Sequence, residues 1–260
     1  MLRRNDVFEM TCDGFGQDAQ GVCHHEGMAV CVPNLLPGET ARVRIVKPEK
    51  RYAFGRVDAL LTASPDRAEP FCPAYKRCGG CTCQHMQYEA TLAFKRDQVQ
   101  ELLRRVGGLD AEVPPVLGME EPFAYRNKGA YPVGGQAGSP VCGFFAPRSH
   151  DLTPLPEQGC RIQREDSRQA VRAVLNWMRE NGVAPYDELT HTGLVRHVMT
   201  RSTRAGGLMV VLVVTKDALP QPQRLIDGLR AAVPGLLSLC ISTNDQRTNV
   251  ILGRTLRTLY

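Results

Sequence analysis

The stretch Glu39–Arg56, "ETARVRIVKPEKRYAFGR", predicts strand structure with a basic face. Arg42 and Arg44 alternate with apolar residues, and this period of two is typical of a half-buried strand. Two aromatic residues, Tyr52 and Phe54, follow directly, and cations interleaved with aromatic rings suit phosphate contact and base stacking. A solvated strand face gives the same charge pattern, so the run by itself leaves both interpretations open.

Residues 6–62, which include this stretch, contain five short apolar runs separated by turn residues. The turn "NLLPGE" is an example, because Pro37-Gly38 fixes one backbone dihedral and frees the next. Five closely spaced strands predict a small closed β-barrel of the OB-like type, which has no free sheet edges, over residues 1–64. The predicted strands are Val7–Cys12, Val22–His24, Met28–Val32, Ala41–Val46 and Phe54–Leu61.

A linker, "ASPDRAEP" (63–70), leads into a cysteine-rich segment and then a helix expected over 86–106. Gly107-Gly108 provides the stop signal for this helix. Together these parts make a second predicted segment, residues 65–110. The apolar residues expected on the buried stripe of the helix are Leu92, Val99, Leu102, Leu103 and Val106.

The remaining residues, 111–260, predict a mixed α+β domain, so that the whole chain is expected to be α+β and multidomain. "AYRNKGAYPV" and "VCGFFAP" are strand-like, and 167–181 is helix-like with Val171, Val174, Leu175 and Met178 inward. The runs "LVRHVMTRS", "GLMVVLVVT", a helix over 221–232, "LLSLCISTN" and "TNVILG" then predict a β-β-α-β-β order with the helix on one sheet face.

Composition indicates a globular protein with an ordinary core. The 260 residues are 43% hydrophobic and carry a net charge of +5, which permits an anionic partner without requiring one. The longest apolar run is too short to cross a bilayer, and the first residues show no signal peptide. We therefore expect a cytoplasmic protein without a membrane partner. In that reducing compartment ten cysteines argue against a disulfide framework.

Four of these cysteines crowd into "CPAYKRCGGCTCQH" (72–85), where Cys72, Cys78 and Cys81 have the spacing C-x5-C-x2-C. A tight turn through Gly79-Gly80 lets neighbouring thiolates reach one centre and directs N–H groups toward sulfur. Zinc sites usually contain two matched ligand pairs, and the sequence lacks a second C-x2-C. The spacing favours an iron–sulfur site, with zinc and inert thiols as the open alternatives.

The cysteine segment resembles that of bacterial RNA (uracil-C5)-methyltransferases, which reads C-x5-C-G-G-C-x-x-Q-H-x-x-Y followed by a helix. Residues 13–57, from "DGFGQ" to "AFGRV", resemble the TRAM domain that precedes this segment in the family. "YRNKGAYPVG", "GFFAPRSHDL", "GCRIQ", "GLVRHVMTR" and "TNVILG" resemble successive blocks of its central domain. The likeness is to the Gram-positive-type enzymes that modify 23S rRNA, and it covers almost the whole chain.

The resemblance implies a [4Fe–4S] cluster held by Cys72, Cys78, Cys81 and Cys160, the last lying in "GCRIQ". Cys83 stands where the family usually has another residue and is expected to be a bystander. The remaining cysteines, Cys12, Cys23, Cys31, Cys142 and Cys240, are expected to pack as small hydrophobes.

The resemblance also implies an S-adenosylmethionine-dependent enzyme that makes 5-methyluridine in 23S rRNA during rRNA processing. In the family a Rossmann-type domain binds this cofactor and carries a cysteine nucleophile. We find no cofactor loop or nucleophile segment before Tyr260, so no catalytic or cofactor-binding residue is assigned. The expectation is that the chain ends before that domain and is inactive by itself. A stand-alone iron–sulfur RNA-binding module without catalysis is the alternative function.

RNA, and 23S rRNA in particular, is the expected partner, bound by a monomer. Six residues are the candidate contacts, and for the last three a structural role in the central sheet is the competing interpretation. They are Arg42, Arg44, Lys47, Arg126, Asn127 and Lys128. Arg196 and Arg201 are two further basic residues to which the same choice applies.

Overall fold

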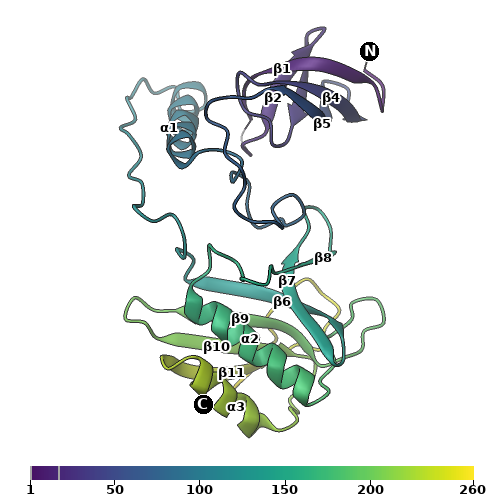
Figure 1. Ribbon diagram of the computed structural model, residues 1–260, viewed down its shortest axis with the longest axis vertical. Helices are drawn as coiled ribbons and strands as arrows, with labels where there is room; N and C mark the ends of the chain where they lie inside the picture. The colour runs from purple at the N-terminus through teal and green to yellow at the C-terminus, as the bar shows by residue number, and fades with distance from the viewer. Residues whose placement is uncertain (1, 17) are drawn as a thin grey trace. The chain divides into compact units, whose positions relative to one another are not determined.

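The computed structural model describes residues 2–16 and 18–260 and has an α+β architecture (Figure 1). Its residues group into two compact units. Unit 1 comprises Met1–Phe71 and Cys81–Glu120, and unit 2 comprises Cys72–Gly80 and Glu121–Tyr260. The division into segments 1–64, 65–110 and 111–260 stays a prediction.

Unit 1 contains a closed five-stranded barrel, as the sequence predicts. The strand order is β1-β2-β3-β5-β4, and antiparallel pairing of β1 with β4 closes the ring. All pairs are antiparallel except β3 with β5, the arrangement of an OB-like barrel. Each predicted strand lies within an observed one. The strands are β1 (Val7–Phe15), β2 (Gly21–His25), β3 (Met28–Val32), β4 (Thr40–Pro48) and β5 (Tyr52–Thr62).

The barrel interior is filled by the apolar residues that alternate along these strands. In β4, Ala41, Val43 and Ile45 are fully buried, while the basic residues between them point outward. The packing is dense: a side-chain Cβ at Gly55 would lie 2.5 Å from Cγ1 of Val43. Glycine at this position therefore lets β5 pass close to the filled interior.

Helix α1 (Tyr88–Arg105) forms where a helix is predicted, but the predicted buried stripe is wrong. Its buried residue is Thr91, whereas Val99 and Leu102 are about half exposed at 47% and 48% and Val106 is 81% exposed. Phe94 packs edge-on against Phe15 of β1, with ring centroids 4.6 Å apart. A barrel that closes on itself offers no broad apolar sheet face, and so the C-terminal half of α1 stays uncovered.

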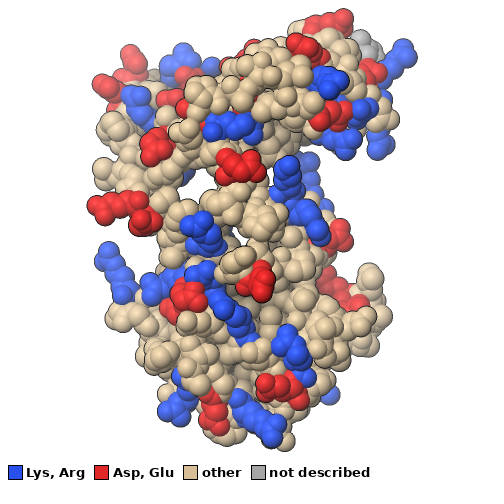
Figure 2. Space-filling view, in the orientation of Figure 1, with Lys and Arg blue, Asp and Glu red and all other residues tan. Residues whose placement is uncertain are grey.

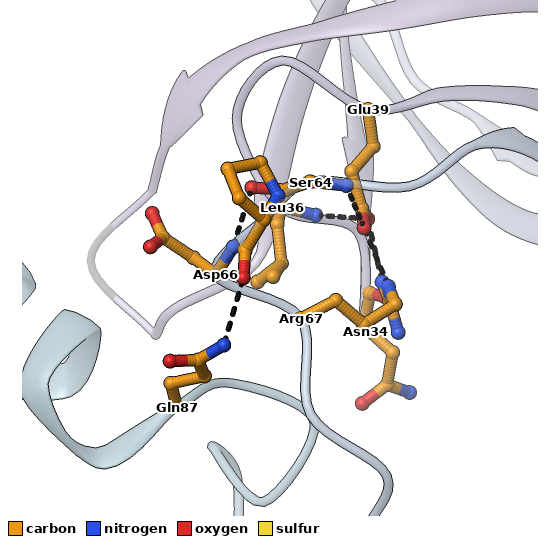
Figure 3. Close-up of polar contacts among 8 residues, drawn as sticks. Asn34, Leu36, Glu39, Ser64, Asp66, Arg67 and Gln87 are labelled. Carbon is orange, nitrogen blue, oxygen red and sulfur yellow. Dashed lines mark hydrogen bonds and ion pairs between the residues drawn. The ribbon is translucent and has the colours of Figure 1, made fainter.

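A buried ion pair fixes the chain where it leaves the barrel (Figure 3). The Glu39 side chain is fully buried and accepts hydrogen bonds from Nε and Nη2 of Arg67, both at 2.5 Å. Backbone N–H groups of Leu36 and Ser64 donate to the same carboxylate at 2.8 and 3.1 Å. Arg67 also donates to the carbonyl oxygen of Asn34. The predicted linker at 63–70 is therefore an anchored segment.

Unit 2 is built on one seven-stranded sheet with helices α2 (Glu165–Glu180) and α3 (Pro222–Ala232) on one face (Figure 1). The strand order is β12-β11-β10-β9-β6-β7-β8, and β10 pairs with β11 in parallel through the α3 crossover. The first four elements of the predicted β-β-α-β-β order are confirmed as β9, β10, α3 and β11. The strands are β6 (Lys128–Gln136), β7 (Ser139–Phe145), β8 (Leu152–Pro154), β9 (Val195–Ser202), β10 (Leu208–Val214), β11 (Leu236–Thr243) and β12 (Thr255–Thr258).

The core of unit 2 lies between this sheet and its two helices. Val171, Val174 and Met178 of α2 are buried there as predicted, beside Trp177. Polar contacts fix the register of helix on sheet, since Ser167 donates to Thr200 Oγ1 at 2.8 Å. None of the helices in the described part of the chain is both long and apolar enough to span a membrane.

The predicted strand "TNVILG" is wrong, because β12 begins only at Thr255. Residues 245–254 instead form a loop after β11, and the buried guanidinium of Arg196 binds its carbonyl groups. Arg196 donates to the carbonyl oxygens of Asn244, Gln246 and Thr248 at 2.7 to 3.3 Å. The Thr248 carbonyl, which belongs to the predicted strand, is therefore not available for a strand ladder.

Replacing Arg67 with Ala should destabilise unit 1 by about 3 kcal/mol, because it leaves the Glu39 carboxylate buried without its cation. Chemical denaturation followed by circular dichroism measures this loss. Arg42→Ala is the matched control, since Arg42 is exposed on β4 and makes no ion pair among the described residues. Equal stabilities of the two variants would contradict the role assigned to the ion pair.

The same pair predicts a pH dependence. Burial raises the pKa of Glu39, but hydrogen bonds from Arg67, Leu36 and Ser64 outweigh burial and hold that pKa below its ordinary value. The stabilisation is therefore complete above the unfolded-state pKa of about 4.3 and is lost as pH falls through the folded-state value. In the Arg67→Ala variant, the Glu39 ion pair should no longer make the free energy of unfolding fall as the pH drops through this range.

Candidate functional site

The first part of the cysteine segment, Cys72–Gly80, belongs to unit 2 and is folded as a series of tight turns. The N–H of Tyr75 donates to the carbonyl of Cys72, and the N–H of Cys78 donates to that of Ala74. Two contacts hold the segment against β7 and β8: the N–H of Gly79 donates to the carbonyl of Phe145 at 3.0 Å, and Thr153 Oγ1 donates to the carbonyl of Arg77 at 3.1 Å.

Gly79 and Gly80 have different reasons to be glycine. A Cβ at Gly79 would lie 2.8 Å from the Phe145 carbonyl oxygen, so any side chain would push the segment off β7. Gly80 directs its N–H toward Sγ of Cys78 at 3.3 Å. Donation from a backbone N–H to sulfur stabilises a thiolate and is typical of cysteines that ligate iron. One N–H of the glycine pair thus points toward sulfur as predicted, whereas the convergence of the thiolates on one centre stays a prediction.

Cys160 also lies in unit 2, in the turn before α2, where its carbonyl accepts from the N–H of Gln163. Burial, followed by the nearby charge of Cys160, raises the pKa of the fully buried Tyr131. Cys81 and Cys83 belong to unit 1. Burial raises the pKa of Cys83, which disfavours the thiolate that a metal would need.

Whether these thiols suit an iron–sulfur cluster can be judged from their chemistry and their placement. The residue types, the Gly79 cradle and the N–H donation to Cys78 fit such a group. Against this, no three His, Cys, Asp or Glu side chains of residues 2–16 and 18–260 stand together in a way that could hold a metal ion. The side chains that the structure describes therefore form no preassembled metal site.

The cysteines outside the segment pack mostly as predicted. Cys12 and Cys23 face each other across β1 and β2 in the barrel core, and both are buried. Burial also raises the pKa of Cys142, in the unit 2 core, to about 12. Cys240 is buried in β11, whereas Cys31 is half-buried. The buried environments suit small hydrophobes.

The basic strand β4 carries one unpaired arginine and two partly neutralised cations. Arg42 is exposed and forms no ion pair among the described residues, although Glu9 lies opposite it across the β1–β4 pair. Arg44 pairs with Asp58 at 2.5 Å, and Lys47 pairs with Glu49 at 2.6 Å. Lys and Arg side chains are likewise interspersed with acidic ones over the visible surface (Figure 2).

Of the three predicted contacts in the central sheet, Arg126 and Asn127 have structural partners. Arg126 Nη2 donates to the carbonyl of Gly80 at 3.3 Å and so supports the cysteine segment. The Asn127 carbonyl accepts from the N–H of Ser202. Lys128 is exposed at the start of β6. The competing structural interpretation therefore describes Arg126 best, while Lys128 remains available for a ligand.

Lys128 lies directly opposite Arg201 across the antiparallel pair β6–β9. Both are exposed, and neither has a carboxylate partner among the residues that the structure describes. Like charges directly opposite each other repel, and an anion bound between them relieves that repulsion. Sequence reasoning did not bring these two residues together, because their register depends on strands far apart in the chain.

Comparison with known proteins places a TRAM domain at residues 3–57. A protein named as an uncharacterized RNA methyltransferase from Halalkalibacterium halodurans is 41% identical over 100% of this chain and 57% of its own length. Similarly named proteins from Listeria innocua and Clostridium tetani are 40% and 38% identical, over 57% and 55% of their lengths. The chain thus spans about half the length of the curated relatives it matches.

The crystal structure of Pyrococcus abyssi tRNA (uracil-54, C5)-methyltransferase in complex with S-adenosyl-L-homocysteine has the same fold over 96% of this chain. The TM-score is 0.69, the identity is 22%, and the match covers 55% of that protein. The expectation that this chain stops short of the cofactor domain is corrected accordingly, because the shared fold covers nearly the whole chain. The expected inactivity has no support in these comparisons. The chain therefore contains a TRAM domain and is similar over its whole length to proteins named as RNA methyltransferases.

Proposed function

We propose that this chain serves an S-adenosylmethionine-dependent RNA (uracil-C5)-methyltransferase whose substrate is 23S rRNA. The observation that carries the proposal is the 41% identity over the whole chain to a protein named as an RNA methyltransferase, together with the TRAM match. The fold shared with a uracil-C5 methyltransferase supports the same reaction class. The choice of 23S rRNA follows from the resemblance of the cysteine segment and the central-domain blocks to those of enzymes that modify 23S rRNA.

The residues described here act in this proposal by binding RNA. The glycine-rich run 133–143 forms the hairpin β6–β7, and an adenosyl cofactor needs a turn from a strand into a helix. Cys240 is buried inside β11, where its thiol cannot reach a base. We therefore derive no methyl-transfer step from these residues, and assign them substrate recognition.

RNA recognition is assigned first to the pair Lys128 and Arg201. Two unpaired cations at one position of a sheet form a binding site for a backbone phosphate, and the charge gives affinity without base specificity. Arg42 supplies a second unpaired cation on the barrel. Arg44 and Lys47 remain proposed RNA contacts. They are weaker ones, because each must break its ion pair with a carboxylate before it can bind a phosphate.

A [4Fe–4S] cluster ligated by Cys72, Cys78, Cys81 and Cys160 remains part of the proposal. Its support is the N–H donation from Gly80 to Cys78 and the steric need for Gly79. When bound, the cluster would supply a structural cross-link, because methyl transfer from a sulfonium donor needs no electron. The chain's own contribution is to hold the thiolates, and the glycine turn orients Cys78 for this role.

Activity is tested with labelled S-adenosylmethionine and unmodified 23S rRNA. We expect the enzyme that this chain serves to place label in 5-methyluridine, because the whole of this chain is similar to proteins named as RNA methyltransferases. Nuclease digestion and chromatography of the nucleosides identify the product. Label confined to another nucleoside would contradict the uracil-C5 reaction, and label in tRNA but not in rRNA would contradict the substrate.

The phosphate site is tested with the double variant Lys128→Ala, Arg201→Ala. RNA affinity should fall by about tenfold. The slope of the log binding constant against log salt concentration should become shallower by the amount expected for about one to two lost phosphate contacts. Filter binding to a structured rRNA fragment at several salt concentrations measures both. Arg257→Ala is the matched control, since Asp217 already holds that guanidinium at 2.5 and 2.8 Å. An unchanged salt slope in the double variant would remove this site from the interface.

The cluster is tested by single Cys→Ser changes at the four ligand positions. Each should cost the anaerobically prepared protein its iron and its brown colour, because a cluster lacking one thiolate is labile. Cys83→Ser is the matched control and should keep its iron. Iron and acid-labile sulfide analysis measures the outcome. Stoichiometric zinc without iron, or full iron in Cys160→Ser, would overturn the ligand set.

A further inference from the structure

Unit 1 has a cavity of about 930 Å³ between its barrel and helix α1. Phe15 of β1 and Phe94 of α1 meet edge-on in its wall, and Leu36, Leu102 and Val106 extend the apolar lining. This volume is in the upper range for ligand sites in proteins, about 300 to 1,000 Å³. The cavity is thus large enough to receive several side chains of a partner.

The apolar surface continues beyond the cavity along α1. Val99, Leu102 and Val106 are 47%, 48% and 81% exposed and have the spacing i, i+3, i+7, so they share one face of the helix. Val99 lies outside the cavity lining. An apolar stripe longer than the cavity fits an elongated apolar partner better than a compact small molecule.

The charge of the cavity is acidic, although the chain as a whole has a net charge of +5. Asp66, Asp97 and Glu101 line it, against one basic residue, Arg105. Arg105 is engaged by Glu101 at 2.5 Å, which leaves Asp66 and Asp97 without a cation among the described residues. Two uncompensated carboxylates repel RNA phosphates and attract a cationic partner.

We propose that this acidic groove, formed by Phe15, Asp66, Phe94, Asp97, Leu102 and Val106, binds a cationic amphipathic helix of a partner protein. The apolar face of that helix would lie on Leu102 and Val106, and its Lys or Arg side chains would lie against Asp66 and Asp97. This is the helix-in-groove mode of recognition, in which apolar anchors recur every three to four residues. The proposal is independent of the methyltransferase assignment.

The test uses the full chain and two synthetic peptides of about 18 residues, long enough to form a helix. One peptide is an amphipathic Lys/Leu helix, and the other has the same pattern with Glu in place of Lys. Fluorescence anisotropy should show binding of the Lys/Leu peptide and none of the Glu/Leu peptide. Asp97→Lys and Val106→Ser should each weaken that binding by about tenfold.

Both variants change exposed side chains, so unfolding temperatures should match that of the unchanged protein. The matched controls are Glu157→Lys and Val250→Ser, which make the same changes at exposed positions of unit 2 and should leave peptide binding unaltered. Failure of the Lys/Leu peptide to bind, equal binding of both peptides, or wild-type affinity in Asp97→Lys and Val106→Ser would overturn the proposal. A loss of rRNA affinity in Val106→Ser would overturn it too, by assigning the groove to RNA.

Discussion

The carboxylate of Glu39 is the interaction on which the arrangement of unit 1 depends. A fully buried carboxylate costs several kcal/mol in desolvation unless hydrogen bonds and a cation compensate it. Here four donations do so, two from Arg67 and one each from the N–H groups of Leu36 and Ser64. Because these donors come from separate loops, satisfying one side chain fixes where the chain leaves the barrel. Arg67 then bridges to Met86, and α1 begins two residues later.

Much of the fold follows from local sequence patterns, because a closed barrel has one inside and one outside. Alternation in β4 indicated a half-buried strand with a basic face, and the apolar residues of that strand do lie in the interior. The pattern failed for α1, since helical spacing tells which residues share a face but not what covers that face. It failed again after β11, where a stretch with a strand-like sequence forms a loop and the Thr248 carbonyl accepts a hydrogen bond from Arg196.

The candidate site was predictable to the extent that its chemistry is local. The cysteine spacing and the glycine pair can be identified within a dozen residues, and the N–H of Gly80 does point at Cys78. Pairings across strands cannot be found in that way. The neutralisation of Arg44 by Asp58 and the meeting of Lys128 with Arg201 both depend on strand register, which distant turns and core packing determine.

The two units alternate along the chain, and this has a consequence for synthesis and for dissection of the protein. Cys72–Gly80 belongs to unit 2 although it is translated before α1 of unit 1. During translation the barrel strands can pair early. The N–H of Gly79, in contrast, has its hydrogen-bond acceptor only after Phe145 has been synthesised. Neither unit is one continuous segment. A fragment ending at Gly80 would carry the barrel without its helix, and one starting at Glu121 would leave the carbonyl of Phe145 without the N–H of Gly79.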